Sequence, residues 1–187
     1  LRGMFSLLIY DLQTKKILVA RDQFGIKPLY VHDCNKFIIF SSEIKPILNY
    51  LKKTNFNYHT IAEFLLLGKQ DHHNTTFFNN IDSVKPSHYY KYTANGIIKK
   101  KYWSIFSNKY KKQNEKKTID ELYNLINSKV DDYLISDRKI GVFMSSGIDS
   151  TSLASLISNK AKYQIDSFTY DFKNNHNLGE SNLAKLN

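Results

Sequence analysis

The chain contains one cysteine in 187 residues, and this scarcity restricts its chemistry. A single thiol can form neither an internal disulfide framework nor a cysteine-rich metal cluster. Long apolar runs are also missing, which argues against a membrane-spanning helix, and the first residues lack the basic and then apolar pattern of a secretion signal. We therefore expect a globular, cytoplasmic protein that has no membrane partner.

Acidic residues are scarce as well, because 17 Asp and Glu stand against 27 Lys and Arg and leave a net charge of +10. A basic chain can bind nucleic acid, but these lysines are spread along the sequence and mixed with asparagines, apart from clusters at 99–101 and 109–117. Such a spread is typical of a solvated surface, so we expect no nucleic-acid partner. The histidines show no metal-ligand spacing.

The lysine-bearing phosphate loop, G-x-x-x-x-G-K-[ST], is absent. Residues 145–150 (SSGIDS) indicate a phosphate loop of another class, because they lie between an apolar run at 140–144 and an expected helix at 150–159. A strand that turns sharply into a helix directs unpaired backbone N–H groups and the positive end of the helix dipole at one point. The hexapeptide therefore predicts a pyrophosphate-binding loop.

Each residue type in this loop suits that chemistry. Ser145, Ser146 and Ser150 supply hydroxyl donors, and Gly147 has no Cβ to obstruct a close approach or a positive φ. Asp149 would repel a polyphosphate unless a cation lay between them, so the loop implies Mg²⁺ held by Asp149. The alternative is a strand-to-helix turn without a ligand, with Ser150 or Asp149 as its N-cap.

The first half of the chain has the pattern of a β protein. An Asn-Gly pair at 95–96 indicates a hairpin, and apolar spacing that ends at Gly68 predicts a helix at 60–68. Short apolar runs separated by turn residues predict antiparallel strands. These strands are expected at 5–10, 16–20, 28–31, 37–40, 89–93 and 97–102.

The period changes after a polar segment at 104–117, which we interpret as a linker. Thr118 and Glu121 form a capping-box pattern at the start of a long amphipathic helix. The order helix, strand, loop, helix and strand at 165–170 is typical of a parallel α/β sheet, where ligands bind at the carboxyl ends of strands. Tyr170 would then border a nucleotide.

Several segments in a fixed order match one known family. They are 1–5 (LRGMF), 20–30 (ARDQFGIKPLY), 41–45 (SSEIK), 85–89 (KPSHY), 102–103 (YW), and the loop with Ser136 and Asp137 upstream. Over essentially its whole length the chain resembles glutamine-hydrolysing asparagine synthetases. The order and spacing of these segments are specific to that family and its near relatives.

This resemblance implies an α/β protein built from parts of two domains. Residues 1–103 would be the later part of an N-terminal nucleophile glutaminase, which is an antiparallel β sandwich. Residues 104–117 would be the linker. Residues 118–187 would begin an ATP-pyrophosphatase domain of the adenine nucleotide alpha hydrolase type, with a parallel sheet.

The resemblance also implies a reaction. The intact enzyme would take glutamine, aspartate and ATP with Mg²⁺, form β-aspartyl-AMP and pyrophosphate, and replace AMP with ammonia carried from glutamine through an internal tunnel. A homodimer is possible in this family. Met144 and Tyr170 match positions that contact the nucleotide, and Met4 matches a position associated with the tunnel.

The chain departs from the family at two positions that concern the sites. Its first residue is Leu1, whereas the family's glutaminase nucleophile is a cysteine that uses its own α-amino group as base. Cys34 lies inside the chain, so we expect no catalytic residue here and an inactive fragment. Ser146 stands where the family usually has glycine, which would cost about 1 kcal/mol if that position required a positive φ.

Three other interpretations remain. A related adenylating amidotransferase would keep the loop and use another acceptor, and a non-catalytic remnant would act as an interaction partner. An RNA-modifying enzyme with a similar loop is disfavoured by the β-rich first half. Beside the turn at Gly25, we expect Arg21 and Asp22 to form an ion pair on the surface or between domains.

Overall fold

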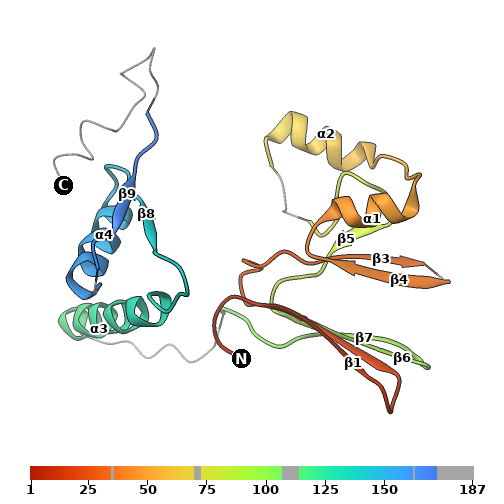
Figure 1. The fold of residues 1–187 in the computed structure, drawn as a ribbon, viewed down its shortest axis with the longest axis horizontal. Coiled ribbons are helices and arrows are strands. Elements are labelled where there is room, and N and C mark those ends of the chain that lie inside the picture. The colour runs from red at the N-terminus through yellow and green to blue at the C-terminus, as the bar shows by residue number, and fades with distance from the viewer. Residues whose placement is uncertain (35, 70–72, 107–113, 162, 172–187) are drawn as a thin grey trace. The chain divides into compact units, whose positions relative to one another are not determined.

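The chain forms two compact units, Leu1–Lys109 and Tyr110–Asn187 (Figure 1). The computed structural model describes residues 1–34, 36–69, 73–106, 114–161 and 163–171. Within these ranges, no helix combines the length and the apolar character that crossing a membrane requires. Each unit has its own helices and strands.

Four antiparallel strands form the larger sheet of the first unit, in the order β1-β2-β6-β7. They are β1 (Ser6–Asp11), β2 (Lys16–Arg21), β6 (His88–Thr93) and β7 (Gly96–Lys101). All four strands are confirmed to within a residue of the predicted bounds. The predicted hairpin is also confirmed, because Thr93 pairs with Gly96, whose φ of 119° favours glycine.

The second sheet of this unit has three antiparallel strands in the order β4-β3-β5. They are β3 (Tyr30–Cys34), β4 (Phe37–Ser41) and β5 (Ile81–Ser83). We did not predict the short β5. Both sheets contribute to one buried apolar cluster, so they pack face to face as a sandwich. The cluster consists of Val19, Leu29, Val31, Val84, Tyr90 and Tyr92.

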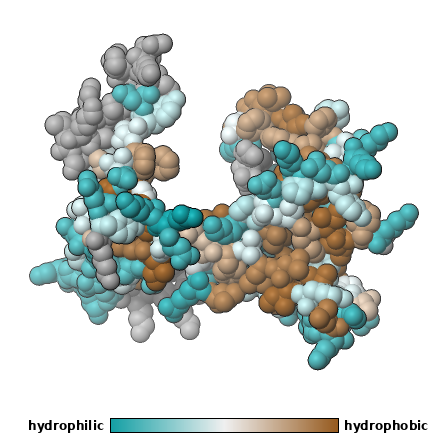
Figure 2. Space-filling view, viewed as in Figure 1, coloured by the Kyte–Doolittle hydropathy of each residue, from teal (hydrophilic) through white to brown (hydrophobic). Residues whose placement is uncertain are grey.

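Two helices lie on the β3–β4–β5 sheet, on the side away from the larger sheet (Figure 1). They are α1 (Ile44–Leu51) and α2 (Tyr58–Leu67). The prediction of α2 is confirmed, including its end at Gly68 in the left-handed conformation. We did not predict α1, which has a proline in its first turn, where helices tolerate one. Apolar residues gather on the exposed side of α2 (Figure 2).

Our expectation of an ion pair between Arg21 and Asp22 is wrong. Asp22 is only 2% exposed, and its carboxylate accepts hydrogen bonds from backbone N–H groups. The donors are Phe5 at 3.3 Å, Phe24 at 3.1 Å, Ile26 at 3.0 Å and Lys27 at 2.9 Å. The carboxylate therefore organises a loop of the first unit, a function that the adjacent charges in the sequence did not reveal.

The guanidinium of Arg21 complements this arrangement by binding acceptors. It donates to the carbonyl oxygens of Gly25, Lys27 and Val84 and to the hydroxyl of Ser83, at 2.6 to 2.8 Å. Asp22 thus binds three N–H groups of residues 23–27, and Arg21 binds two of their carbonyl groups.

Two opposing effects set the pKa of Asp22. Burial by itself raises the pKa, but the N–H groups of Lys27, Ile26, Phe24 and Phe5 stabilise the carboxylate and bring its pKa below the ordinary value of 3.8. The resulting stabilisation is complete above the unfolded-state pKa near 3.8. It is lost as the pH falls through the lower folded-state pKa.

The second unit begins with α3 (Glu115–Tyr133) and continues with β8 (Gly141–Phe143), α4 (Ile148–Lys160) and β9 (Asp166–Phe168). Strands β8 and β9 pair in parallel, as the alternation of elements predicted. The capping-box prediction is wrong, because α3 starts inside the predicted linker. Its N-cap is Asn114, whose side chain accepts from the N–H of Lys116, so residues 115–117 are helical.

Replacing Asp22 by asparagine should lower the free energy of unfolding of the first unit by at least about 2 kcal/mol at pH 7, because hydrogen bonds to a charged group are stronger than neutral ones. The difference from wild type should narrow below pH 3.8, where the wild-type carboxylate must also take up a proton. Urea unfolding, followed by the fluorescence of Trp103, the single tryptophan, measures the free energy of unfolding of wild type and variant at each pH.

The matched control is Asp11→Asn. Asp11 accepts N–H bonds from Gln13 and Thr14 in the exposed turn between β1 and β2, so its loss should have a smaller effect. A stability difference for Asp22→Asn that stays constant between pH 7 and pH 3 would contradict this account.

Candidate functional site

The predicted phosphate loop lies between the carboxyl end of β8 and the amino end of α4. Ser145 and Ser146 are partly buried and Gly147 is exposed, while Ile148 starts the helix. The loop is neither enclosed nor wholly helical, so an anion can approach it from solvent.

The side chains of this loop bond to one another. The Ser150 hydroxyl lies 2.8 Å from the Ser145 hydroxyl and accepts the N–H of Ser145 at 3.1 Å. The N–H of Gly147 donates to the Ser145 hydroxyl, also at 3.1 Å. Two of the three predicted hydroxyl donors are therefore held together at the start of α4.

The first turn of α4 has no side-chain cap. Its N-cap is Gly147, in an extended conformation and without a side-chain hydrogen bond, so neither Ser150 nor Asp149 is the N-cap that the ligand-free alternative expected. Ser150 instead donates back to the carbonyl oxygens of Ser145 and Gly147. The N–H groups of a first helical turn have no intrahelical acceptors, so those of α4 can serve an anion.

Backbone strain does not arise at the two central residues of the loop. Gly147 has φ of −74°, and Ser146 is not among the described non-glycine residues that have a positive φ. The serine at position 146 therefore carries none of the strain that a left-handed conformation would impose. A Cβ at Gly147 would lie 3.2 Å from the Ser145 hydroxyl, so glycine matters here for space and not for a positive φ.

The two predicted nucleotide contacts lie at the carboxyl ends of neighbouring parallel strands. Met144 follows β8 and donates its N–H to the carbonyl of Phe168 at 2.9 Å, while the Thr169 hydroxyl donates to the carbonyl of Met144 at 2.9 Å. The strand β9 ends at Phe168 and is therefore shorter than predicted. Tyr170 comes two residues later and is 74% exposed.

A cavity of about 360 Å³ lies between these strands and α4. Met144 is the predicted site residue that lines it. The helix contributes residues that we did not predict, namely Thr151, Ala154, Ser155, Ser158 and Asn159. Their spacing of three and four residues places small and hydroxyl-bearing side chains on one helix face, a signal that the sequence did contain.

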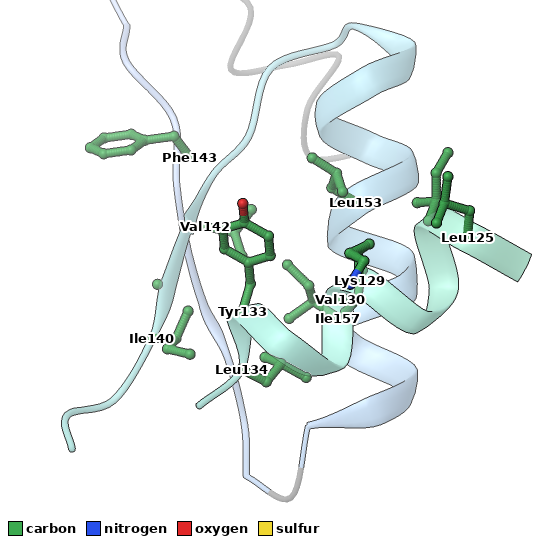
Figure 3. A pocket seen from close by; sticks show the side chains of 12 residues that line it. Leu125, Lys129, Val130, Tyr133, Leu134, Ile140, Val142, Phe143, Leu153 and Ile157 are labelled. Atoms are coloured by element: carbon green, nitrogen blue, oxygen red, sulfur yellow. The ribbon is translucent and has the colours of Figure 1, made fainter. Parts of the chain in front are cut away.

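A second cavity, of about 640 Å³, is lined by α3, β8 and α4 (Figure 3). Its walls are apolar except for the Tyr133 hydroxyl and Lys129, whose ammonium bonds to Asp132 of its own helix, so it does not suit a polyphosphate. In Figure 3 the ring of Tyr133 lies between β8 and α4. The predicted apolar face of α3 thus contacts the other elements through its second half.

The remaining candidates lie apart from the loop in the sequence. Met4 precedes β1 in the first unit and is 43% exposed, so it is not a core residue. Cys34 ends β3 and its thiol donates to the carbonyl of Phe37. Within the described ranges no group of three or more His, Cys, Asp or Glu is placed to hold a metal ion, and Asp149 lies exposed in the first turn of α4.

Lys160 ties the end of α4 to α3. Its ammonium bonds to the carboxylate of Asp131 at 2.6 Å and to the carbonyl of Asn127 at 2.7 Å.

Lys160→Met should lower the stability of α4 against local opening by about 1 kcal/mol, since the Lys160 ammonium is a partly buried charge. Hydrogen exchange of the α4 amides in the whole chain measures this loss. Lys129→Met, which breaks only the pair with Asp132, is the control and should change exchange by less than about 0.5 kcal/mol.

Comparisons with known proteins agree with the order of the two units. Residues 1–103 match the family described as glutamine amidotransferase domain, and residues 121–186 match the one described as asparagine synthase. "Asparagine synthetase [glutamine-hydrolyzing] 2" of Bacillus subtilis is 33% identical over 84% of this chain, and "Amidase chry2" of Gibberella zeae is 29% identical over 87%. The chain spans only 23% and 24% of the lengths of these relatives.

Among solved structures, the glutamine phosphoribosylpyrophosphate amidotransferase of B. subtilis is similar to 82% of this chain and 30% of its own, with a TM-score of 0.27 and 13% identity. The sequence matches cover most of the chain and follow its order. The chain therefore belongs to the glutamine amidotransferase domain family and joins this domain to a segment of the asparagine synthase family, as in glutamine-hydrolysing asparagine synthetases.

Proposed function

We propose that this chain is part of a protein that makes asparagine from aspartate, with ATP as the activating substrate and glutamine as the ammonia source. The aspartate side-chain carboxylate attacks the α-phosphorus of ATP, which gives β-aspartyl-AMP and releases pyrophosphate. Ammonia from glutamine then attacks the activated carbonyl and releases AMP. The main support is the exposed, uncapped strand-to-helix turn in a segment that matches asparagine synthase.

The loop would bind the departing pyrophosphate. The N–H groups at the start of α4 and the positive end of the helix dipole would both attract its negative charge. The hydroxyls of Ser145 and Ser150, now 2.8 Å apart, would exchange their mutual hydrogen bond for bonds to phosphate oxygens, and Ser146 would add a third hydroxyl. Stabilising the leaving group in this way favours adenylation.

Asp149 fits the role of magnesium ligand. Its carboxylate is exposed in the first turn of α4, beside the N–H groups that would face the phosphates, and carboxylate oxygens are preferred Mg²⁺ ligands. When bound, Mg²⁺ would neutralise charge on the pyrophosphate. Asp149 would hold the cation at the start of α4, where the helix dipole favours the negative charge of the pyrophosphate.

Met144 and Tyr170 would hold the adenosine part of the nucleotide. They follow neighbouring parallel strands, and the carboxyl ends of such strands are where ligands bind in α/β sheets. The cavity beside Met144 offers room next to the loop.

The proposal assigns no residue of this chain to the chemistry of glutamine hydrolysis. The nucleophile that the family uses is a cysteine with a free α-amino group. Cys34, at the end of β3, is an internal residue of the chain and has no such amine. The residue of the first unit to which the proposal does assign a role is Met4, which would border the path of ammonia.

A second candidate function is amidation of another carboxylate by the same adenylating chemistry. The similarity to an amidase favours it, because that relative is nearly as similar to the chain as the asparagine synthetase. Both functions use the same loop, and they differ in the acceptor that becomes adenylated.

Asp149→Asn should weaken Mg²⁺-dependent binding of pyrophosphate to the 187-residue chain by about tenfold or more, because it removes the charged ligand of the cation. Isothermal titration with pyrophosphate, with and without Mg²⁺, measures this change. Asp166→Asn is the matched control, since Asp166 is also exposed but starts β9 at the opposite end of the strand pair. Equal binding with and without Mg²⁺ would rule out the proposed role of Asp149.

The whole protein that contains this chain should release pyrophosphate from ATP only when aspartate is present, with either glutamine or ammonia as nitrogen donor. Coupled pyrophosphate detection, with asparagine measured in parallel, tests this expectation. Release that aspartate does not stimulate, but another carboxylic acid does, would instead support the second candidate function.

A further inference from the structure

The buried carboxylate of Asp22 connects the start of the first unit to a distant loop. It accepts the N–H of Phe5, the residue after Met4, and the N–H of Asp22 donates to the carbonyl of Phe5 at 2.8 Å. The same carboxylate accepts the N–H groups of Phe24, Ile26 and Lys27. One side chain thus fixes the segment that carries Met4 to residues 23–27.

The same loop is tied to the turn before β6. The N–H of Ser87 donates to the carbonyl of Asp22 at 2.9 Å, and its hydroxyl donates to the carbonyl of Gln23 at 2.8 Å. Ser87 is only 4% exposed and has φ of 62°, which is unfavourable for a serine. The hydrogen bonds to Asp22 and Gln23 hold Ser87 in this conformation. Space is also tight, because a Cβ on Gly25 would lie 2.7 Å from Cγ of Pro86.

The far side of this cluster is the end of β7 and the residues that follow it. The Tyr102 hydroxyl donates to the carbonyl of Arg21 at 2.6 Å, and the N–H of Tyr102 donates to the carbonyl of Ser87 at 2.8 Å. The ring of Phe24 meets Trp103 edge-on, with centroids 5.3 Å apart. Asp22 therefore lies between the segment that carries Met4 and the last residues before the polar segment that starts at 104.

Because Asp22 is buried, its role is structural and not chemical. Its carboxylate is taken up by four backbone donors and is out of reach of a substrate, so it can act only through the segments that it holds. Among those segments, the one with Met4 is the one that our proposed function places along the path of ammonia.

We infer that Asp22 is a positioning residue, which holds the Met4 segment in register with residues 23–27 and Trp103 and thereby sets how much of the ammonia from glutamine reaches the adenylated acceptor. The rate of glutamine hydrolysis depends on other groups. This inference rests on the proposed function for its consequence, while the positioning itself is a property of the first unit.

Positioning can be tested without any activity. The chain has two methionines, Met4 and Met144, so methyl-labelled methionine gives two NMR signals, and Met144 in the second unit is an internal reference. Asp22→Asn should shift or broaden the Met4 signal and change the fluorescence of Trp103, and it should leave Met144 unchanged. Asp11→Asn should alter none of these signals. An unchanged Met4 signal in Asp22→Asn would overturn the inference.

Coupling is tested on the whole protein by the amount of glutamate formed per pyrophosphate released. Asp22→Asn should raise this ratio at least threefold, and pyrophosphate release supported by added ammonia should stay at the wild-type level per folded molecule. A role confined to stability would reduce all activities together and leave the ratio at its wild-type value, which would refute coupling. If wild type releases no pyrophosphate with any nitrogen source, the proposed function fails, and the NMR result still decides the positioning role.

Asp22→Glu covers the case in which the asparagine variant does not fold. It keeps the charge and moves the carboxylate by one methylene, so the hydrogen bonds to Phe5 and Lys27 cannot both keep their lengths. The same shift of the Met4 signal and the same rise in the ratio are expected, and a wild-type Met4 signal in a folded Asp22→Glu protein would contradict the inference.

Discussion

Asp22 holds the first unit together through a buried carboxylate whose hydrogen-bond donors are backbone N–H groups of the chain itself. An aspartate this deeply buried would be destabilising without such partners, because transferring a charge out of water is unfavourable. With them, the carboxylate links Phe5, residues 23–27 and, through its own backbone, Ser87. The loop between β2 and β3 has no regular structure of its own, so this charge and the neighbouring Arg21 replace the hydrogen bonds that a strand or helix would supply.

The second unit relies on a different use of unpaired backbone groups. At the start of α4 the helix is left without a side-chain cap, while Ser145 and Ser150 bond to each other. A glycine N-cap stabilises a helix less than a serine or aspartate N-cap, by roughly a few tenths of a kcal/mol. A loop that forgoes this stabilisation keeps its N–H groups available, which is the property that binding of an anion requires. Stability and binding therefore compete for the same donors.

In the function that we propose, one reaction must deliver ammonia to another. Ammonia is small and is lost to water unless its path is held in shape. If Met4 borders that path as we propose, the rigidity that Asp22 gives to the Met4 segment would help to keep the path in shape. Through the Tyr102 hydroxyl and the ring contact of Phe24 with Trp103, the same cluster reaches the residues that follow β7.

Local patterns in the sequence were sufficient for the strands of the larger sheet, the hairpin at Gly96, the end of α2 at Gly68 and the exposed turn before α4, because apolar alternation and glycine act over a few residues. They were insufficient for β5, for the start of α3 and for the side chains of α4 that line the cavity beside Met144. The partners of Arg21 and Asp22 were also decided by tertiary structure alone. The side chain of Arg21 bonds to residues as far as 63 positions away. The predicted surface ion pair is absent because Asp22 is buried and each side chain has its own set of partners. No short-range pattern encodes such contacts, since they exist only once the sheets have packed.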